Sequence, residues 1–67
     1  MKVFVNGQET EVAAGCTLQD LCSQLGIGEY EPVAVAIGTD VTERGRWSSL
    51  QLNENDNITI IRATCGG

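Results

Sequence analysis

The sequence contains no histidine, and its 67 residues include only one proline, one tryptophan, one tyrosine and one phenylalanine. Without histidine the chain cannot form Ser-His or Cys-His nucleophile pairs, and it has no imidazole ligand for a metal. Its three cysteines are too few for a four-cysteine zinc site, and an odd number fits poorly with a disulfide-stapled secreted domain. We therefore expect reduced thiols, a cytoplasmic location and little catalytic chemistry within the chain.

Basic residues are also scarce. Four Lys and Arg stand against nine Asp and Glu, which gives a formal net charge of -5 and a pI near 4.3. Nucleic acids and anionic membranes both attract clustered basic side chains, so we expect neither as a partner. The sequence has no apolar run of the roughly 18 residues that a membrane helix needs, and it does not open on a secretory signal pattern. A basic surface on another protein fits the charge better.

The length of 67 residues allows one small domain at most. Such a domain hides only about 60% of the surface that its unfolded chain exposes, and it cannot enclose a large substrate cleft. The apolar fraction of 42% nevertheless argues against disorder. We expect a folded domain whose function depends on other proteins.

The N-terminal part of the sequence predicts a β-hairpin. Residues 2–5 are rich in β-branched and aromatic types, which favour a strand. Asn6 and Gly7 follow, and both tolerate the positive φ of a tight hairpin turn. Residues 8–13 then alternate in polarity as a second strand would, and Gly15 ends that segment.

A short helix is predicted next. Thr17 is a favourable N-cap, and Asp20 stands where a capping box places its acidic partner. Apolar side chains then follow at helical spacing on one face, at Leu18, Leu21, Cys22 and Leu25. Gly26 suits the left-handed conformation that ends many helices.

Two further strands are predicted in the second half of the chain. Residues 33–37 form a short apolar run between Pro32 and Gly38, which is typical of a buried strand rather than a helix. Residues 58–62 form the last strand, after a polar turn at residues 53–57.

The segment between these two strands has no clear period. We expect an irregular course from Val41, with a short strand or helical turn at residues 48–52. A helix that follows a hairpin must cover one face of the sheet, and the crossover that it creates favours a parallel strand pair. The predicted fold class is therefore α+β. It is a β-grasp (ubiquitin-like) arrangement, with a mixed sheet of four to five strands and one helix packed across it.

The sequence ends in Gly66-Gly67, soon after the last predicted strand. One interpretation is a frayed end or a cloning scar. The other is functional, because two residues without side chains can thread a narrow channel and carry the Gly67 carboxylate into a partner's active site. We favour the second and divide the chain into a β-grasp domain at residues 1–62 and a flexible reactive tail at residues 63–67.

Taken in order, these segments resemble the ThiS/MoaD family of ubiquitin-like sulfur carriers, and most of all its ThiS branch. The resemblance covers the whole chain. It is carried by residues 3–7, 17–21 and 33–37, by Val41, Arg44 and Trp47, by Asn55, Asp56 and Ile58, and by Gly66-Gly67. Two loop positions depart from the family pattern, with Gly38 where Asn is common and Glu43 where Pro is common.

The resemblance implies a carrier rather than an enzyme, with no bound cofactor. A partner similar to ubiquitin-activating enzymes would adenylate the Gly67 carboxylate with ATP. A sulfur donor of the cysteine desulfurase or rhodanese type would then supply the sulfur of a thiocarboxylate. Thiazole synthase would accept that sulfur for thiamine biosynthesis. Alternatives are a MoaD-like or other carrier for molybdopterin or cysteine, a ubiquitin-like protein modifier, and a plain β-grasp interaction module.

The three cysteines and a basic and aromatic cluster are further candidates for function. Cys65 would lie beside the reacting carbonyl, but no basic neighbour lowers its pKa, so we favour a tolerated small residue. Cys22 is expected in the core and Cys16 in a half-buried position. Arg44, Arg46 and Trp47 form a basic and aromatic cluster that either docks a partner, or has Trp47 capping the core while both arginines are solvated.

Overall fold

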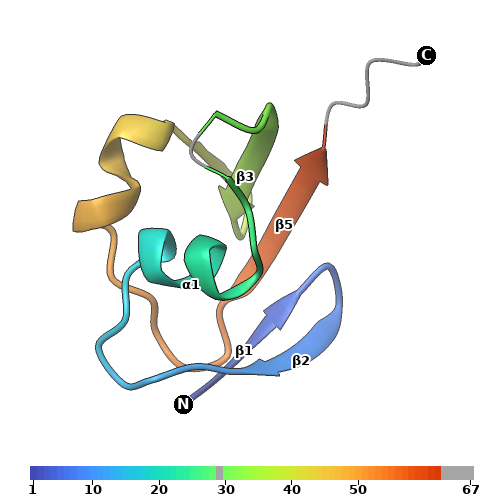
Figure 1. The fold of residues 1–67 in the computed structure, drawn as a ribbon. Helices are drawn as coiled ribbons and strands as arrows, with labels where there is room; N and C mark the ends of the chain where they lie inside the picture. Colours follow the sequence, from blue (N-terminus) through green and yellow to red (C-terminus); the bar gives the residue numbers. More distant parts are fainter. Residues whose placement is uncertain (29, 63–67) are drawn as a thin grey trace.

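The computed structural model describes residues 1–28 and 30–62 of the chain. These residues form a five-stranded sheet in the order β2-β1-β5-β3-β4, and the helix α1 packs across one face of it (Figure 1). The elements are β1 (Lys2–Val5), β2 (Gln8–Glu11), α1 (Leu18–Gln24), β3 (Val33–Ile37), β4 (Asp40–Thr42), the 3-10 helix η1 (Arg44–Ser49) and β5 (Asn57–Arg62).

The predicted hairpin is confirmed. β1 and β2 pair antiparallel, with Val5 opposite Gln8. The turn residues Asn6 and Gly7 have φ values of 51° and 82°, which is the left-handed pair that a tight hairpin turn requires. β2 ends at Glu11 rather than at residue 13.

The predicted helix is confirmed together with both of its ends. The Thr17 hydroxyl accepts the Asp20 N–H at 3.2 Å, and the Asp20 carboxylate accepts the Thr17 N–H at 3.0 Å. This reciprocal pair satisfies two backbone donors that the first turn leaves open. At the other end Gly26 has a φ of 78° directly after the last helical residues.

The expected parallel pair lies at the centre of the sheet. β5 runs parallel to β1, with Phe4 opposite Asn57, and antiparallel to β3, with Val35 opposite Ile60. This central parallel pair, with the helix laid across one face, is the β-grasp arrangement (Figure 1).

The expectation of an irregular segment after Val41 is wrong. Asp40–Thr42 forms the edge strand β4, which pairs with β3 through a turn in which Gly38 has a φ of 62°. The 3-10 helix η1 follows directly, and residue 51 then makes a single bridge to Thr17. A three-residue strand is too short to produce a periodic sequence signal. A 3-10 helix has three residues per turn, so it does not produce the 3.6-residue period by which an α-helix is recognised.

The expectation that β3 is a buried strand also needs correction, because only its middle residue Val35 is fully buried. Ala34 is exposed on the face of the sheet opposite α1, which nothing covers within the described part of the chain. Small alanine side chains gave this half-exposed strand the apolar appearance of a buried one.

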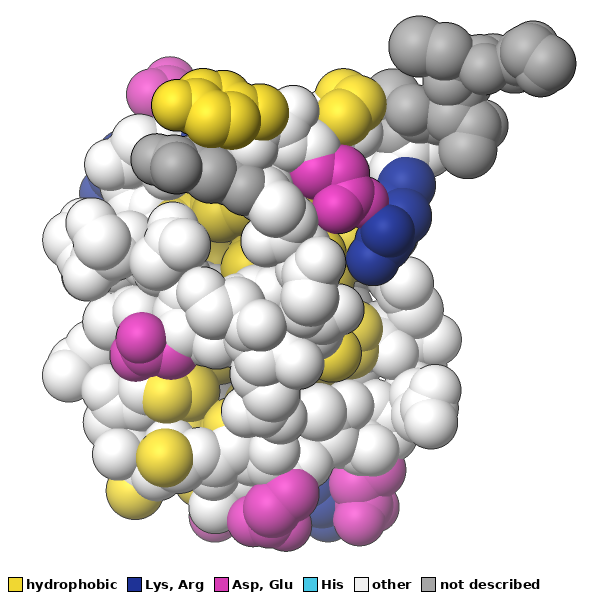
Figure 2. All heavy atoms as spheres, in the orientation of Figure 1, with side chains coloured by type: hydrophobic (Ala, Val, Ile, Leu, Met, Phe, Trp, Pro, Cys, Tyr) yellow, Lys and Arg dark blue, Asp and Glu magenta, His cyan; other side chains and the backbone are white. Residues whose placement is uncertain are grey.

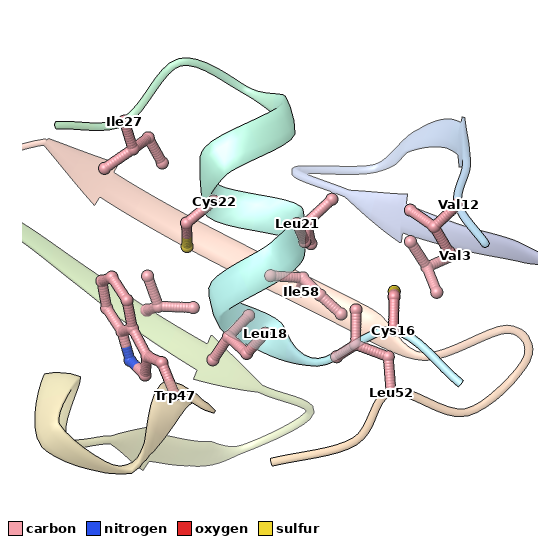
Figure 3. Packing of buried hydrophobic residues seen from close by; sticks show 11 residues of the cluster. Val3, Val12, Cys16, Leu18, Leu21, Cys22, Ile27, Trp47, Leu52 and Ile58 are labelled. Atoms are coloured by element: carbon pink, nitrogen blue, oxygen red, sulfur yellow. The ribbon is translucent and has the colours of Figure 1, made fainter. Parts of the chain in front are cut away.

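The core lies between α1, η1 and the inner face of the sheet. Figure 3 shows its side chains gathered in this layer, with Trp47 at one end and Val3 and Val12 at the other. The buried apolar residues are Val3, Val12, Cys16, Leu18, Leu21, Cys22, Ile27, Val35, Trp47, Leu52 and Ile58.

Candidate functional site

The candidate site is the C-terminal end of β5, because the predicted reactive residues follow it. β5 is the middle strand of the sheet and ends at Arg62 (Figure 1). Cys65, Gly66 and Gly67 lie outside the described residues, so their roles in the tail stay predictions. The described residues end at Arg62, and we call the end of β5 with the side chains around it the root of the tail.

One side of this root is held by the side chain of Asn6. Its Oδ1 accepts the Ile60 N–H at 2.8 Å, and its Nδ2 donates to the Ile60 carbonyl oxygen at 3.2 Å. The Asn6 N–H itself donates to the Ile58 carbonyl oxygen at 2.8 Å. In a parallel pair the Asn6 carbonyl would accept the next β5 amide, but the chain turns away here, and the side-chain amide takes that place.

The other side of the root is held by Glu31. Its Oε2 lies 2.5 Å from Nη1 of Arg62, the last residue of β5, and its Oε1 accepts the Gly28 N–H at 3.2 Å. The two side chains of the ion pair are 27% and 55% exposed for Glu31 and Arg62. One carboxylate therefore connects the end of β5 to the segment that follows α1.

Arg44 holds the same segment from the side of η1. Its guanidinium donates to the carbonyl oxygens of Gly28 and Glu31, and it lies over the Trp47 ring, 4.6 Å from the centroid. The Trp47 Nε1–H donates to the Thr42 hydroxyl at 3.1 Å. The contacts run without a break from β4 through η1 to the residue that pairs with Arg62.

The structure brings the predicted pair Arg44 and Trp47 together, but mainly inside the domain. Trp47 is 1% exposed, so it caps the core and a partner cannot reach its ring in this conformation. Arg44 is half-buried and hydrogen-bonded rather than solvated, which corrects that alternative for Arg44, whereas Arg46 is exposed as the alternative expected. A docking role for the exposed part of Arg44 stays a prediction.

The two described cysteines are not activated thiols. Cys22 is 1% exposed and Cys16 is 8% exposed. Burial raises the pKa of both, the charge of Asp20 raises that of Cys16 further, and Arg44 only partly opposes the effect at Cys22. Burial therefore outweighs any lowering of the Cys16 thiol pKa by the nearby helix N-terminus.

Residues 1–28 and 30–62 hold no group of three or more His, Cys, Asp or Glu side chains that could bind a metal. A shallow cleft of about 380 Å³ lies between α1 and η1, with Cys22, Arg44 and Trp47 in its lining. Its arginine already donates to backbone carbonyl oxygens and its thiol is protonated, so the cleft offers no reactive group. In the same residues no helix is long and apolar enough to cross a membrane.

Within the part of the chain that the structure describes, large apolar side chains are exposed at three places, Tyr30 (92%), Val41 (79%) and Ile61 (63%). Two of them are next in sequence to the ion pair at the root, Tyr30 beside Glu31 and Ile61 beside Arg62. Figure 2 shows acidic side chains in several places on this face and few basic ones. The root of the tail is therefore flanked by apolar surface on an acidic domain.

Sequence reasoning missed Asn6, Glu31 and Arg62 as residues of the site. Asn6 carried a turn signal, which explains its backbone but not the second use of its amide. Glu31 and Arg62 are far apart in sequence and carried no motif. Their only signal was position, one beside Pro32 before a strand and the other at the end of the last strand.

A mixed five-stranded sheet with one helix across it, and a central strand near the C-terminal end of the sequence, defines a small ubiquitin-like β-grasp protein. Residues 3–67 match the model of the ThiS family, and the chain belongs to that family.

Similar proteins fall into two groups by length. The sulfur carrier protein ThiS of Escherichia coli is 28% identical over 67 residues, and the match covers all of both chains. Thiazole synthases of Magnetococcus marinus and Paramagnetospirillum magneticum are 36% and 27% identical over the whole of this chain. The chain spans about one fifth of the length of these two relatives, since the match covers 20% of each.

Two solved structures of similar proteins belong to the group of short chains, because the match covers all or most of each. The crystal structure of a thiamine biosynthesis protein (ThiS) from Geobacter metallireducens superposes with a TM-score of 0.83 at 26% identity and full coverage of both chains. The solution structure of a thiamine biosynthesis protein from the same organism gives a TM-score of 0.81 at 26% identity, covering 88% of that chain.

Proposed function

We propose that the chain is a sulfur carrier for thiazole formation in thiamine biosynthesis, and that its Gly67 carboxylate carries the sulfur as a thiocarboxylate. The observation that carries this proposal is the full-length match to a protein named as a sulfur carrier. The Gly66-Gly67 pair that follows β5 supports it, because this pair gives the carboxylate a slim approach to a partner's active site.

The chemistry asks little of the domain itself. A carboxylate is a poor electrophile, so a ubiquitin-activating-enzyme-like adenylyltransferase would use ATP to form an acyl adenylate and release pyrophosphate. The terminal sulfur of a persulfide, held by a desulfurase or rhodanese type donor, would attack the acyl carbon and expel AMP. A second thiol would reduce the resulting acyl disulfide and free the thiocarboxylate.

The described residues fit a carrier better than an enzyme. The buried thiols of Cys16 and Cys22 are protonated at neutral pH, and the sequence has no histidine to act as a base. The catalytic groups would therefore belong to the partners, and the domain would contribute recognition and placement. A cytoplasmic location agrees with this role, since activation needs ATP and reduced thiols.

Thiazole synthase is the acceptor that the comparisons favour. Two relatives that are named thiazole synthases contain a segment similar to this whole chain within one fifth of their length. A carrier-like segment and a synthase within one polypeptide suggest that the two work together. The net charge of -5 would favour encounter with a basic surface around the synthase cleft.

Mass spectrometry of the intact chain tests the proposal. Incubation with ATP, a sulfur donor and the cognate activating enzyme should add the mass of one oxygen-to-sulfur exchange at the C-terminus. A chain that lacks Gly67 should keep the circular dichroism of the full chain and gain no mass. If the full chain gains no sulfur while the same enzyme activates another carrier, the proposal is wrong.

The acceptor is tested separately from activation. The thiocarboxylate form should lose its sulfur in the presence of thiazole synthase and its small-molecule substrates, and the carboxylate should return. Transfer to a molybdopterin synthase or to a cysteine-forming enzyme instead would assign the chain to another carrier pathway. Conjugates to lysine that resist reductant would indicate a protein modifier.

A further inference from the structure

The last three residues of β5 remain paired with β3, and side chains hold them from both sides. On the β1 side, backbone pairing stops where the chain turns at Asn6, and the side-chain amide of Asn6 makes two hydrogen bonds to Ile60. On the β3 side, Arg62 lies opposite Val33 and its guanidinium pairs with Glu31. Without the Asn6 side chain, the end of β5 would be hydrogen-bonded on the β3 side alone.

The Asn6 contacts follow from the turn that surrounds them. Asn6 has a φ of 51°, a left-handed conformation that turns its own carbonyl away from the path of β1. An asparagine tolerates this conformation and also carries a donor and an acceptor that copy a backbone peptide. A glycine would serve the turn equally well but would leave the Ile60 N–H without its Asn6 acceptor.

The Glu31 contacts are similarly two-sided. One carboxylate oxygen accepts from Gly28 and the other meets Arg62, while the Glu31 carbonyl oxygen accepts from Arg44. The residue is therefore fixed at its backbone and at its carboxylate, which lowers the entropic cost of holding Arg62 in one place.

We propose that Asn6 and Glu31 are positioning residues that fix the point and direction at which the chain leaves the domain at Arg62, so that the Gly67 carboxylate reaches a partner's active site in register. The inference rests on the proposed carrier function. Residues 63–67 can span at most roughly 17 Å, so the position of Arg62 limits the region of a partner's active site that the Gly67 carboxylate can reach.

The first arm of the test uses the free chain and needs no partner. Asn6→Gly should speed amide hydrogen exchange at Ile60, and Glu31→Gln should lower the backbone order parameter at Arg62. Glu31→Gln should unfold at nearly the temperature of the parent chain, and Asn6→Gly several degrees lower, because it loses two hydrogen bonds. Glu9→Gln removes the same charge and serves as the matched control. Glu9 lies on β2, two strands away from β5, and is level with the first residue of β5 rather than with its end.

The second arm measures conversion to the thiocarboxylate at increasing carrier concentration. Asn6→Gly should lower kcat about tenfold, the effect of losing two hydrogen bonds, and Glu31→Gln about two- to fivefold. KM should stay within about twofold of the parent value, because the surface that docks is unchanged. The exchanged pair Glu31→Arg with Arg62→Glu should recover part of the activity that either single change loses, because it restores the ion pair but not the acceptor for the Gly28 N–H.

Each outcome decides between the inference and the function on which it rests. A parent chain that is never converted defeats the proposed function, and the free-chain arm still decides whether the two residues order the end of β5. Unchanged exchange and order parameters, unchanged kcat in both variants, or a loss confined to KM would overturn the inference. An exchanged pair as slow as the single variants would overturn the part assigned to the ion pair of Glu31 and Arg62.

Discussion

The guanidinium of Arg44 stacks on the indole of Trp47, with its central carbon 4.6 Å from the ring centroid. The same group donates to the backbone carbonyl oxygens of Gly28 and Glu31. The planar guanidinium can stack on an aromatic ring and donate hydrogen bonds to two carbonyl oxygens at the same time, which the ammonium group of lysine cannot do. The pair therefore joins η1 to the segment that holds Arg62, and links the core to the root of the tail.

Replacement of Arg44 by lysine should destabilise the domain by about 1–2 kcal/mol. The ammonium group keeps the charge but cannot cover the ring and reach both carbonyl oxygens at once. Urea unfolding, followed by the fluorescence of the single tryptophan, measures the change.

Arg46→Lys is the matched control for this substitution, because Arg46 lies on the same short helix with an exposed side chain. It should change the free energy of unfolding by no more than about 0.5 kcal/mol. Equal effects at the two positions would show that the Arg44 contacts contribute nothing to stability.

Thr42→Val should cost about 1–3 kcal/mol although the side chain keeps its shape. The hydroxyl accepts the Trp47 Nε1–H and donates to the Val35 carbonyl oxygen at 2.7 Å, so valine leaves a buried indole donor without its acceptor. Thr59→Val is the control, since Thr59 is exposed on β5. A Thr42→Val variant as stable as Thr59→Val would mean that the indole finds another acceptor.

Local patterns explain how much of the fold could be predicted. The Asn6-Gly7 turn and the capping box of Thr17 and Asp20 depend on neighbours in sequence, and both formed as expected. β4 and η1 were missed because a three-residue strand and a six-residue 3-10 helix are too short to repeat their patterns often enough to be recognised.

The candidate site was predicted only in part, for a different reason. The reactive Gly67 was inferred from its place in the sequence and from family resemblance. The residues that hold the root act across 54 positions for Asn6 and Ile60, and across 31 for Glu31 and Arg62. Such contacts are set by strand order and register, which no local pattern records. Trp47 was left open because an aromatic beside arginines is typical of both a core and an interface.

Gly26→Ala should destabilise the domain by about 1 kcal/mol. Gly26 has a φ of 78°, a left-handed conformation that is unfavourable for alanine by about 1 kcal/mol. The cost is conformational, because no atom lies within 4 Å of the added Cβ. Gly28→Ala tests the same substitution nearby, where the space is also open and φ lies outside the left-handed region. It should be neutral or slightly stabilising in urea unfolding. A cost at Gly28 equal to that at Gly26 would contradict this explanation.

The buried thiols predict a loss of stability at alkaline pH. Burial raises the pKa of Cys16 and Cys22 above the unfolded value of about 8.5, so the unfolded chain ionises first. Their contribution is therefore fully present below about pH 8.5 and is lost as the pH rises through the native pKa values. Urea unfolding of a Cys65→Ser chain, from pH 7 to pH 10, should show this fall.

The Met1 amino group titrates in the same range, because its hydrogen bond with Glu11 raises its pKa, so the total slope does not isolate the thiols. The contribution of the Cys22 thiol is isolated by comparing the pH dependence of the free energy of unfolding between the Cys65→Ser chain and the same chain with Cys22→Ala. The second chain is less stable throughout, since it loses a core side chain, but its free energy of unfolding should fall less steeply above pH 8.5. Parallel curves for the two chains would show that the Cys22 thiol ionises equally well in the folded domain, and its burial would then be incomplete in solution.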